Sequence, residues 1–411
     1  MIKLLENKME KTNSRSFVLF LISPILGLVE AFRDLKSKQS RQVLFGFCLC
    51  FGICFSVGTE RFEGSSDGIS MRQEFEEAKN LTTDQYISYL SEYFEFDRGA
   101  QDIYIVSVAF FVGKFTENYH FFFLFLAFVF AFFQLKCLRY FVKEKNYNNS
   151  IICVILVCLF LWNNIYNING ARFWTAAWIG LFCLFKVLYD KKPLYILVSA
   201  CTLLVHASFA VFPAILLLAY LLKGGDKSLL VMFIASWVFS VFAEDFKIPF
   251  LGNIELPFLI GKKVEYYTDS DYIGSLSNAS YGSGFYWVQI LFRSIARHYI
   301  DLLILLVALN KKHIFDKRTG AIIGGMIVFA TLSNFGMIVP TFGGRFFAMN
   351  YALVAYSFLV TFGDKKFKTL VYLLPLVWFM NLFYLAKDII AVLDFGFLLS
   401  PIISFVRFAI L

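Results

Sequence analysis

Residues 151–189 read IICVILVCLFLWNNIYNINGARFWTAAWIGLFCLFKVLY, two apolar runs joined by a polar stretch. The hydrocarbon core of a bilayer is about 30 Å thick and needs roughly 20 mainly apolar residues per helix. The runs 150–166 and 173–189 are therefore each close to the length of one membrane crossing. The polar residues between them fit a turn at one membrane face. This stretch predicts a helical membrane protein.

The same pattern recurs along the whole chain of 411 residues. Apolar residues make up 59% of the sequence and aromatic residues 19%, and the mean hydropathy is +0.66. We expect a single integral membrane domain over residues 1–411, folded as an all-α polytopic helix bundle of about 11–13 spans. The apolar runs are 17–32, 42–58, 118–141, 150–166, 173–189, 193–207, 208–222, 228–243, 285–309, 319–339, 345–362 and 367–385.

Lysine and arginine clusters at the ends of consecutive runs define one face of the predicted bundle. Cytoplasmic loops of membrane proteins are enriched in Lys and Arg, so we assign this face to the cytoplasm. Two long acidic loops, 59–117 and 244–284, then lie at the opposite, outer face. The net charge of +8 is therefore a topology signal, and we expect no nucleic-acid partner. The clusters are at residues 33–41, 139–145, 191–192, 223–227, 311–318 and 365–368.

The two ends of the chain are open to more than one interpretation. Run 17–32 is short and contains Pro24, so it is either a first span or a re-entrant or interfacial segment. Residues 102–115 are apolar but too short to span comfortably, and we expect a helix on the outer surface. The tail 386–411 is a similar surface helix or a last span.

Four charged or titratable side chains interrupt the apolar helices on the predicted outer side: Arg172, His206, Arg293 and Arg345. A charge at a helix centre costs roughly 2.5–3.5 kcal/mol on insertion scales, so such residues mark candidate functional sites. From Arg172 the chain crosses to the basic pair 191–192 at the cytoplasmic face and returns to His206. Each of these two helical segments is about 25 Å long at the rise of an α-helix. We therefore expect Arg172 and His206 in the same leaflet.

Later segments add further cations to this side. Arg345 follows the stretch PTFGG at residues 340–344, and we expect it to open a helix after a tight turn that the glycine pair permits. Arg293 and Arg297 are four residues apart and share one helix face, with His298 beside them.

These residue types together favour a phosphate-containing ligand. Arginine presents a planar fork that matches phosphate oxygens, and a helix N-terminus adds partial positive charge. Arg172 and Arg345 both lie at predicted helix starts, so we predict a pyrophosphate site, with a neutral His206 as general base. Each residue alone has an ordinary explanation as an interfacial anchor or a packed histidine. The prediction depends on the convergence of Arg172, His206 and Arg345.

Several other chemistries are excluded by the motifs that the sequence lacks. There is no GxxxxGK[ST] for a nucleotide-driven pump, no HExxH or other metal-ligand spacing, and no GxSxG nucleophile elbow. We therefore expect no cofactor and no metal ion. Asp67, with Glu63 nearby, fits a divalent cation, but the spacing does not demand one.

Three segments resemble the EpsG/Wzy group of polysaccharide polymerases. They are SDGISMRQEF at residues 66–75, NGARFW at 169–174 followed by VHAS at 205–208, and GRF at 344–346. The opening ISPILG at 22–27 also resembles this group, so the similarity runs over most of the chain. One departure is the pair Arg72-Gln73, where relatives often have Arg-Tyr, which weakens any role for an aromatic residue there.

The resemblance implies an inverting, metal-independent glycosyl transfer at the periplasmic face of the bacterial inner membrane, without a nucleotide sugar. The donor would be a growing glycan on undecaprenyl pyrophosphate, and the acceptor a lipid-linked repeat unit. The product would be O-antigen, capsule or exopolysaccharide. Besides membrane lipid, the expected partners are a flippase and a chain-length regulator.

Residue roles follow from the resemblance combined with the charge pattern. Arg172 and Arg345 would hold the pyrophosphate leaving group and stabilise its developing charge, and His206 would accept or orient the acceptor hydroxyl proton. The expected substrate-binding residues are Arg293, Arg297, His298, Asp67 and Arg72. The tyrosines expected to stack on sugar faces are Tyr86, Tyr89, Tyr93, Tyr266, Tyr267 and Tyr281.

Two other classes of membrane protein fit part of this pattern. An O-antigen ligase uses the same lipid carrier but concentrates its chemistry in one large late loop, whereas here the early loop 59–117 is the larger. A flippase or transporter for lipid-linked oligosaccharide needs charges along a path through the midplane, whereas here they gather at one face. A polytopic acyltransferase would need a histidine near the cytoplasm, opposite to His206.

Overall fold

The computed structural model describes residues 15–58, 67–94, 103–222, 227–242, 286–310, 316–338, 340–398 and 400–410. Within these ranges the chain forms helices and no β-strand, with one isolated bridge between Phe55 and Leu393. The prediction of an all-α bundle is confirmed. The predicted loop 244–284 lies outside the described residues, as does the segment 59–66.

Among the described residues, four helical stretches are long and apolar enough to cross a membrane: Tyr119–Val142, Ile151–Tyr189, Lys317–Ile338 and Phe342–Phe362. A fifth arises if α20 (Lys368–Val377) and α21 (Phe379–Val392), which are bent by 46°, count as one span. This number is below the about 11–13 expected from apolar length. Three predicted runs, 193–207, 208–222 and 228–243, correspond to the shorter apolar helices Tyr195–Val205, Ala207–Leu221 and Lys227–Val241.

The stretch Ile151–Tyr189 turns back on itself. It comprises α8 (Ile151–Phe160), the 3₁₀ helix η1 (Ile165–Gly170), α9 (Ala171–Leu184) and the π-helix η2 (Phe185–Tyr189). The Phe160 ring lies 6.0 Å from Trp178 and 6.5 Å from Phe185. In one straight helix, positions 25 residues apart would be separated by about 38 Å. The runs 150–166 and 173–189 are therefore separate legs, as predicted.

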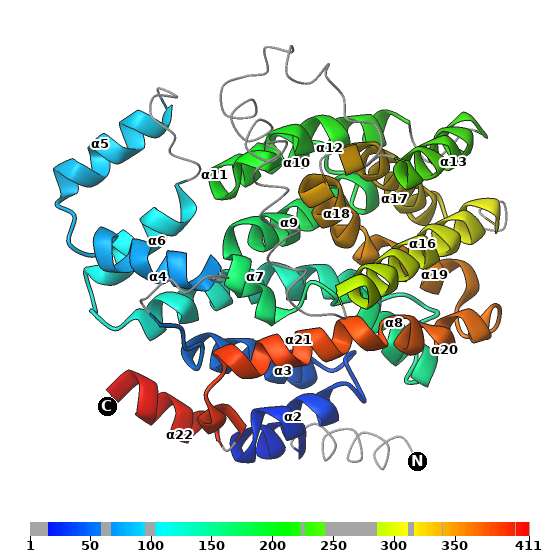
Figure 1. The fold of residues 1–411 in the computed structure, drawn as a ribbon. Coiled ribbons are helices and arrows are strands. Elements are labelled where there is room, and N and C mark those ends of the chain that lie inside the picture. The colour runs from blue at the N-terminus through cyan, green and yellow to red at the C-terminus, as the bar shows by residue number, and fades with distance from the viewer. Residues whose placement is uncertain are drawn as a thin grey trace.

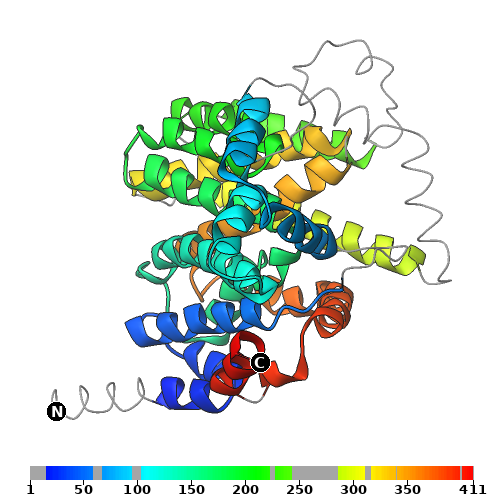
Figure 2. The same cartoon turned by 90° about the vertical axis from the view of Figure 1, so that its left-hand side faces the viewer.

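The helices are arranged in layers that Figures 1 and 2 show from two sides. One outer layer holds α2 (Pro24–Ala31) and α3 (Lys38–Ile53), and the middle layer holds α7 (Tyr119–Val142) and α9. The opposite layer holds α12 (Phe212–Leu221), α13 (Lys227–Val241) and α17 (Lys317–Phe335). The remaining long helices are α16 (Tyr286–Asn310), α18 (Pro340–Met349) and α19 (Tyr351–Phe362).

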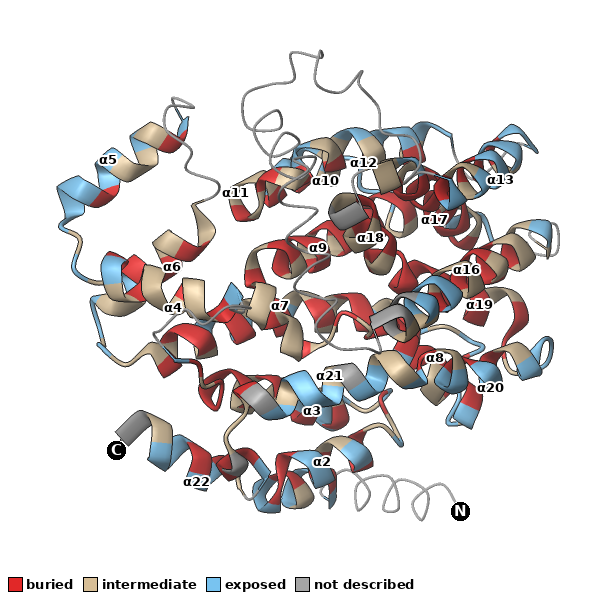
Figure 3. Ribbon diagram, in the orientation of Figure 1, coloured by how far each residue is buried: buried red, intermediate tan, exposed pale blue. Residues whose placement is uncertain are grey.

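Burial is greatest on α7, α9, α17 and α19, whereas exposed apolar side chains follow α2, α13, α20 and α21 (Figure 3). Apolar side chains such as Leu376 and Ile390 are 66% and 69% exposed. Such surface is tolerated where lipid is the solvent. The outer helices of the bundle therefore carry the lipid-facing surface.

Three helices replace much of the predicted acidic loop 59–117. They are α4 (Asp67–Ala78), α5 (Thr83–Phe94) and α6 (Tyr104–Gly113), which lie together at the left of Figure 1. The helical prediction for residues 102–115 is confirmed by α6. It packs on α4 and α7, with Ile105 and Ala109 fully buried, because the apolar side of a short helix needs a partner.

The two ends of the chain lie against each other. Residues 15–22 are helical, and a break at Ser23 separates them from α2, which begins at Pro24, a favoured first position. The tail is divided into η8 (Phe395–Leu398), α22 (Pro401–Phe405) and the π-helix η9 (Val406–Ile410), and not one long helix. The Ser400 hydroxyl donates to the Leu21 carbonyl at 2.9 Å, and the Asn118 amide donates to the Phe408 carbonyl at 2.6 Å.

Candidate active site

An asparagine-rich turn places Arg172 at the second position of α9. The Asn164 side chain accepts from the Tyr166 N–H at 2.9 Å, and the Asn167 amide donates to Asn163 Oδ1 at 2.9 Å. Asn163 in turn donates to the Trp174 carbonyl at 3.1 Å. Asparagine side chains of this kind satisfy backbone groups that a turn leaves without helical partners. The turn therefore fixes where α9 starts and where Arg172 points.

Helix α4 docks on this turn. The Gly68 N–H donates to Asn169 Oδ1 at 3.0 Å, and a Cβ at Gly68 would lie only 2.6 Å from the same oxygen. The Asp67 carboxylate lies beside Gly170, at the start of α9. A small residue at position 68 is thus required for the close approach of α4 to the start of α9.

Arg172 forms an ion pair with Glu74 of α4. The two side chains are 27% and 28% exposed, so the pair is open to solvent on one side. Glu74 was missed by the sequence analysis. A usable signal is its spacing of seven residues from Asp67, which puts both carboxylates on the same face of one helix.

Phe173 brings the other predicted residues to this place. Its ring lies 5.4 Å from the His206 ring, in an edge-on arrangement, and 5.7 Å from the Arg345 guanidinium. Phe173 itself is buried. Its neighbour Arg172 is thus on the same turn of α9 as the residue that contacts both His206 and Arg345. Phe173 thus contacts His206 and Arg345, and its sequence neighbour Arg172 contacts Glu74. We call Glu74, Arg172, His206 and Arg345 the Arg172 site.

The backbone break at His206 determines the hydrogen bonding of its ring. His206 has φ −158° and ψ 124°, between α11 (Thr202–Val205) and η4 (Ala207–Val211), and it caps η4. Its Nδ1 accepts from the Ser208 N–H at 3.2 Å and lies 2.6 Å from the Ser208 hydroxyl. A ring nitrogen that accepts a backbone N–H carries no proton, so the neutral ring carries its proton on Nε2. Nε2 is then a hydrogen-bond donor, which fits orientation of a substrate oxygen better than proton abstraction.

The predicted turn between 193–207 and 208–222 is present, but the break falls at His206. Pro213 lies in the first turn of α12, where its missing N–H costs little.

Arg345 does not open a helix, contrary to the prediction. Helix α18 begins at Pro340, so Arg345 lies inside it and receives nothing from a helix N-terminus. The glycine pair is helical as well. A Cβ at Gly343 would lie 2.6 Å from the backbone of Gly336 and Met337, so the residue allows α18 to pack closely on the preceding 3₁₀ turn, η7 (Gly336–Ile338).

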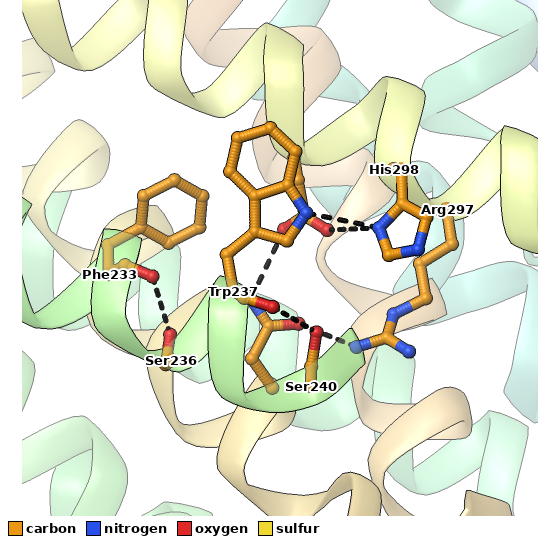
Figure 4. A network of polar contacts seen from close by, with 8 residues as sticks. Phe233, Ser236, Trp237, Ser240, Arg297 and His298 are labelled. Atoms are coloured by element: carbon orange, nitrogen blue, oxygen red, sulfur yellow. Dashed lines mark hydrogen bonds and ion pairs between the residues drawn. The ribbon is translucent and has the colours of Figure 1, made fainter. Parts of the chain in front are cut away.

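Arg297 and His298 belong to a different polar network, shown in Figure 4. Arg297 donates to Asn334 Oδ1 at 3.0 Å, and the Trp237 indole donates to His298 Nδ1 at 3.0 Å. Asn334 also donates to Asp301 at 3.2 Å, and Asp301 is fully buried. This network joins α13, α16 and α17. Its contacts favour a structural role for Arg297 and His298 over the predicted substrate contact.

Arg293, Asp67 and Arg72 take three different positions. Arg293 is exposed on α16, and Asp67 is exposed at the start of α4. Arg72 donates to the Val57 carbonyl, and its guanidinium stacks 3.7 Å from the centre of the Tyr119 ring. Arg72 thereby ties α4 to the start of α7.

Two of the tyrosines expected to stack on sugars are used in packing. Tyr86 is 8% exposed, stacks on Phe110 at 4.2 Å and donates to the Ser107 hydroxyl at 2.8 Å. Tyr93 is 5% exposed and bonds to the Leu203 carbonyl at 3.3 Å. That prediction was wrong for both. Tyr266, Tyr267 and Tyr281 lie outside the described residues.

In the described part of the chain, no three His, Cys, Asp or Glu side chains come together in a way that could hold a metal ion. The Arg172 site is instead a group of two arginines, one histidine and one carboxylate, with a second carboxylate, Asp67, beside it. Such a group can bind a multiply charged oxyanion.

A family model described as the EpsG family matches residues 43–398, nearly the whole chain, and its range includes every residue of the Arg172 site. The chain belongs to the EpsG family. This is a Wzy-type, polysaccharide polymerase-like family, and the apolar helices make the chain a membrane protein. The resemblance drawn from residues 66–75, 169–174, 205–208 and 344–346 is thus confirmed. No curated protein and no solved structure matches the chain.

Proposed function

We propose that this EpsG-family protein joins undecaprenyl-pyrophosphate-linked oligosaccharide repeat units at the periplasmic face of the inner membrane. The observation that carries the proposal is that Phe173 contacts both His206 and Arg345, while Arg172 precedes it at the start of α9. These residues come from three separate segments of the chain. Their meeting at the start of α9 supports a shared ligand more strongly than three independent lipid anchors.

The leaving group in such a transfer is a lipid pyrophosphate. Arg172 and Arg345 would bind its oxygens, because guanidinium groups remain charged and match phosphate geometry. As the bond between the sugar C1 and the phosphate oxygen lengthens, negative charge builds on the pyrophosphate. Cations already in place stabilise that charge without reorganisation, which lowers the barrier. His206 Nε2–H would donate to an oxygen of the acceptor sugar or of the pyrophosphate.

The position of the site along its helices supports a periplasmic location. Arg172 starts α9, and the basic residues 191–192 follow the other end of the same leg. Lys and Arg mark the cytoplasmic ends of membrane helices. Donors that carry a finished repeat unit on a membrane lipid would therefore meet the Arg172 site after a flippase has moved them outward, and a chain-length regulator would act beside it.

The test is the surface glycan of a deletion strain complemented with the wild type, Arg172→Ala, His206→Ala or Arg345→Ala, separated on a gel. Arg139→Ala is the matched control, because Arg139 is exposed in the last turn of α7 and outside the Arg172 site. We expect the wild type and the control to restore a ladder. The three site variants should leave single repeat units at equal protein levels in the membrane fraction. A deletion that removes single units as well would contradict a polymerase and indicate a ligase or a flippase.

A further inference from the structure

We propose that Glu74 is the general base of this glycosyl transfer, and that its ion pair with Arg172 holds it inactive until a pyrophosphate binds. The inference rests on the proposed function. It names the group that accepts the proton of the acceptor hydroxyl, a role for which the sequence alone pointed only to His206.

The hydrogen bonds of His206 indicate that the general base is a different residue. Nδ1 is used as acceptor by the Ser208 N–H at 3.2 Å, so the other ring nitrogen carries the proton. A base must instead offer a lone pair to the acceptor hydroxyl. At the Arg172 site, carboxylates come from α4, whose face toward the start of α9 carries Asp67 and Glu74.

Of these two carboxylates, Glu74 has the better position. It contacts the Arg172 guanidinium directly and is 28% exposed, so it is partly shielded from water while remaining reachable by a substrate. Asp67 lies at the exposed start of α4. Glu76, two residues further along the same helix, is engaged by Lys79 at 2.7 Å.

The ion pair between Glu74 and Arg172 is of the kind that a substrate can exchange. A partly exposed pair is weak because water screens both charges. A pyrophosphate carries more negative charge than one carboxylate and can bond two N–H groups of the same fork. Binding of the lipid donor would therefore draw Arg172 toward the phosphate and release the Glu74 oxygen, so that the base becomes available only when a donor is present.

The step balances without a further reactant. The Glu74 carboxylate takes the proton of the acceptor hydroxyl while that oxygen forms a bond to C1 of the donor sugar. The bond from C1 to the phosphate oxygen breaks, and its electron pair stays on the pyrophosphate beside Arg172 and Arg345. An inverting transfer needs the base and the leaving group on opposite faces of the sugar. Release of Glu74 from Arg172 is therefore part of the step, because the pyrophosphate stays with Arg172 on one face of the sugar while the Glu74 carboxylate acts from the other.

The experiment uses the purified full-length protein, reconstituted in vesicles, with a synthetic undecaprenyl-pyrophosphate-linked repeat unit as both donor and acceptor. Glu74→Gln is compared with Glu74→Asp and Glu74→Ala, the latter with and without added formate. Glu77→Gln, an exposed position on the same helix, is the matched control. Chain growth is followed as kcat and as KM for the lipid-linked unit.

We expect Glu74→Gln to lower kcat by about 10²- to 10⁴-fold, the usual contribution of a general base, without raising KM. Glu74→Asp should keep part of the activity, and formate should restore turnover to Glu74→Ala, which also shows that the variant is folded. Glu77→Gln should match the wild type.

Three results would overturn the assignment. One is a Glu74→Gln protein with wild-type kcat. Another is a raised KM with unchanged kcat, which would make Glu74 a positioning residue for Arg172. The third is that Glu74→Asp is inactive and that formate does not restore the turnover of Glu74→Ala. If the wild type itself extends no substrate, the proposed polymerase function fails and the base role with it.

Discussion

Replacement of Gly68 by alanine tests whether α4 is held on the turn before α9. A Cβ at this position would lie 2.6 Å from Asn169 Oδ1 and 3.0 Å from the Phe55 ring, whereas ordinary contact begins at 3.4 Å. Helix α4 must therefore withdraw by about 0.8 Å at this end, which takes the Gly68 N–H beyond hydrogen-bonding distance of Asn169. Overpacking costs roughly 1–3 kcal/mol and a lost hydrogen bond roughly 0.5–1.5 kcal/mol.

We expect the local opening of α4 to become easier by about 2–3 kcal/mol, which corresponds to amide exchange about 30- to 150-fold faster. Hydrogen exchange of peptides covering residues 67–78 measures this directly, with peptides from α19 as internal reference. The control variant is Gly320→Ala, because a Cβ at Gly320 meets nothing within 4 Å and alanine is the better helix former. Unchanged exchange over 67–78 in Gly68→Ala would refute the docking of α4 through Gly68 and Asn169.

Three further predictions concern the neighbouring networks. Arg297→Ala removes the cation that donates to Asn334, so we expect a loss of about 1–3 kcal/mol in unfolding free energy, whereas exposed Arg293→Ala should stay within about 0.5 kcal/mol. Chemical denaturation in mild detergent compares the two variants, and equal stabilities would contradict a structural network. Ser208→Ala deletes the hydroxyl that lies 2.6 Å from His206 Nδ1 but keeps the hydrogen bond from the Ser208 backbone N–H. The rate of chain growth should therefore fall only about two- to tenfold, whereas His206→Ala should lose far more. Similar losses in both variants would show that the hydroxyl has a role of its own. Phe173→Leu keeps an apolar side chain but removes the aromatic face beside Arg345. A loss of about 1 kcal/mol of cation–π attraction should weaken donor binding about fivefold, with little change in the amount of protein in the membrane fraction. An unchanged KM would show that Phe173 does not organise the site.

Much of the bundle could be predicted from apolar length and charge because both are properties of local sequence. The return of His206 to the start of α9, where it contacts Phe173, is an example, since two legs of similar length require a return to the same level. The helix start at Arg172 could also be predicted, because an asparagine-rich stretch ending in glycine is a strong turn signal.

The errors share a physical cause: they concern contacts between distant segments. Pro340 at the first position of α18 is a helix-start signal, but the following glycine pair was interpreted as a turn, although Gly343 serves close packing against η7. Glu74 was passed over because it is one of many acidic residues in 59–117, and only the docking of α4 singles it out. Tyr86 and Tyr93 were assigned to sugars because a sequence does not show which face of a helix is covered.

The contact between the two ends of the chain has a consequence for biogenesis. Ser400 bonds to Leu21, which was made 379 residues earlier. At a synthesis rate of roughly 5–20 residues per second, about 20–80 s separate the two residues at the ribosome. Throughout that time the surface of α2 and α3 that the tail later covers is without its native partner. Bundle closure is therefore a late event, and a ribosome stalled before residue 400 would leave an inserted but open chain, a substrate for membrane quality control.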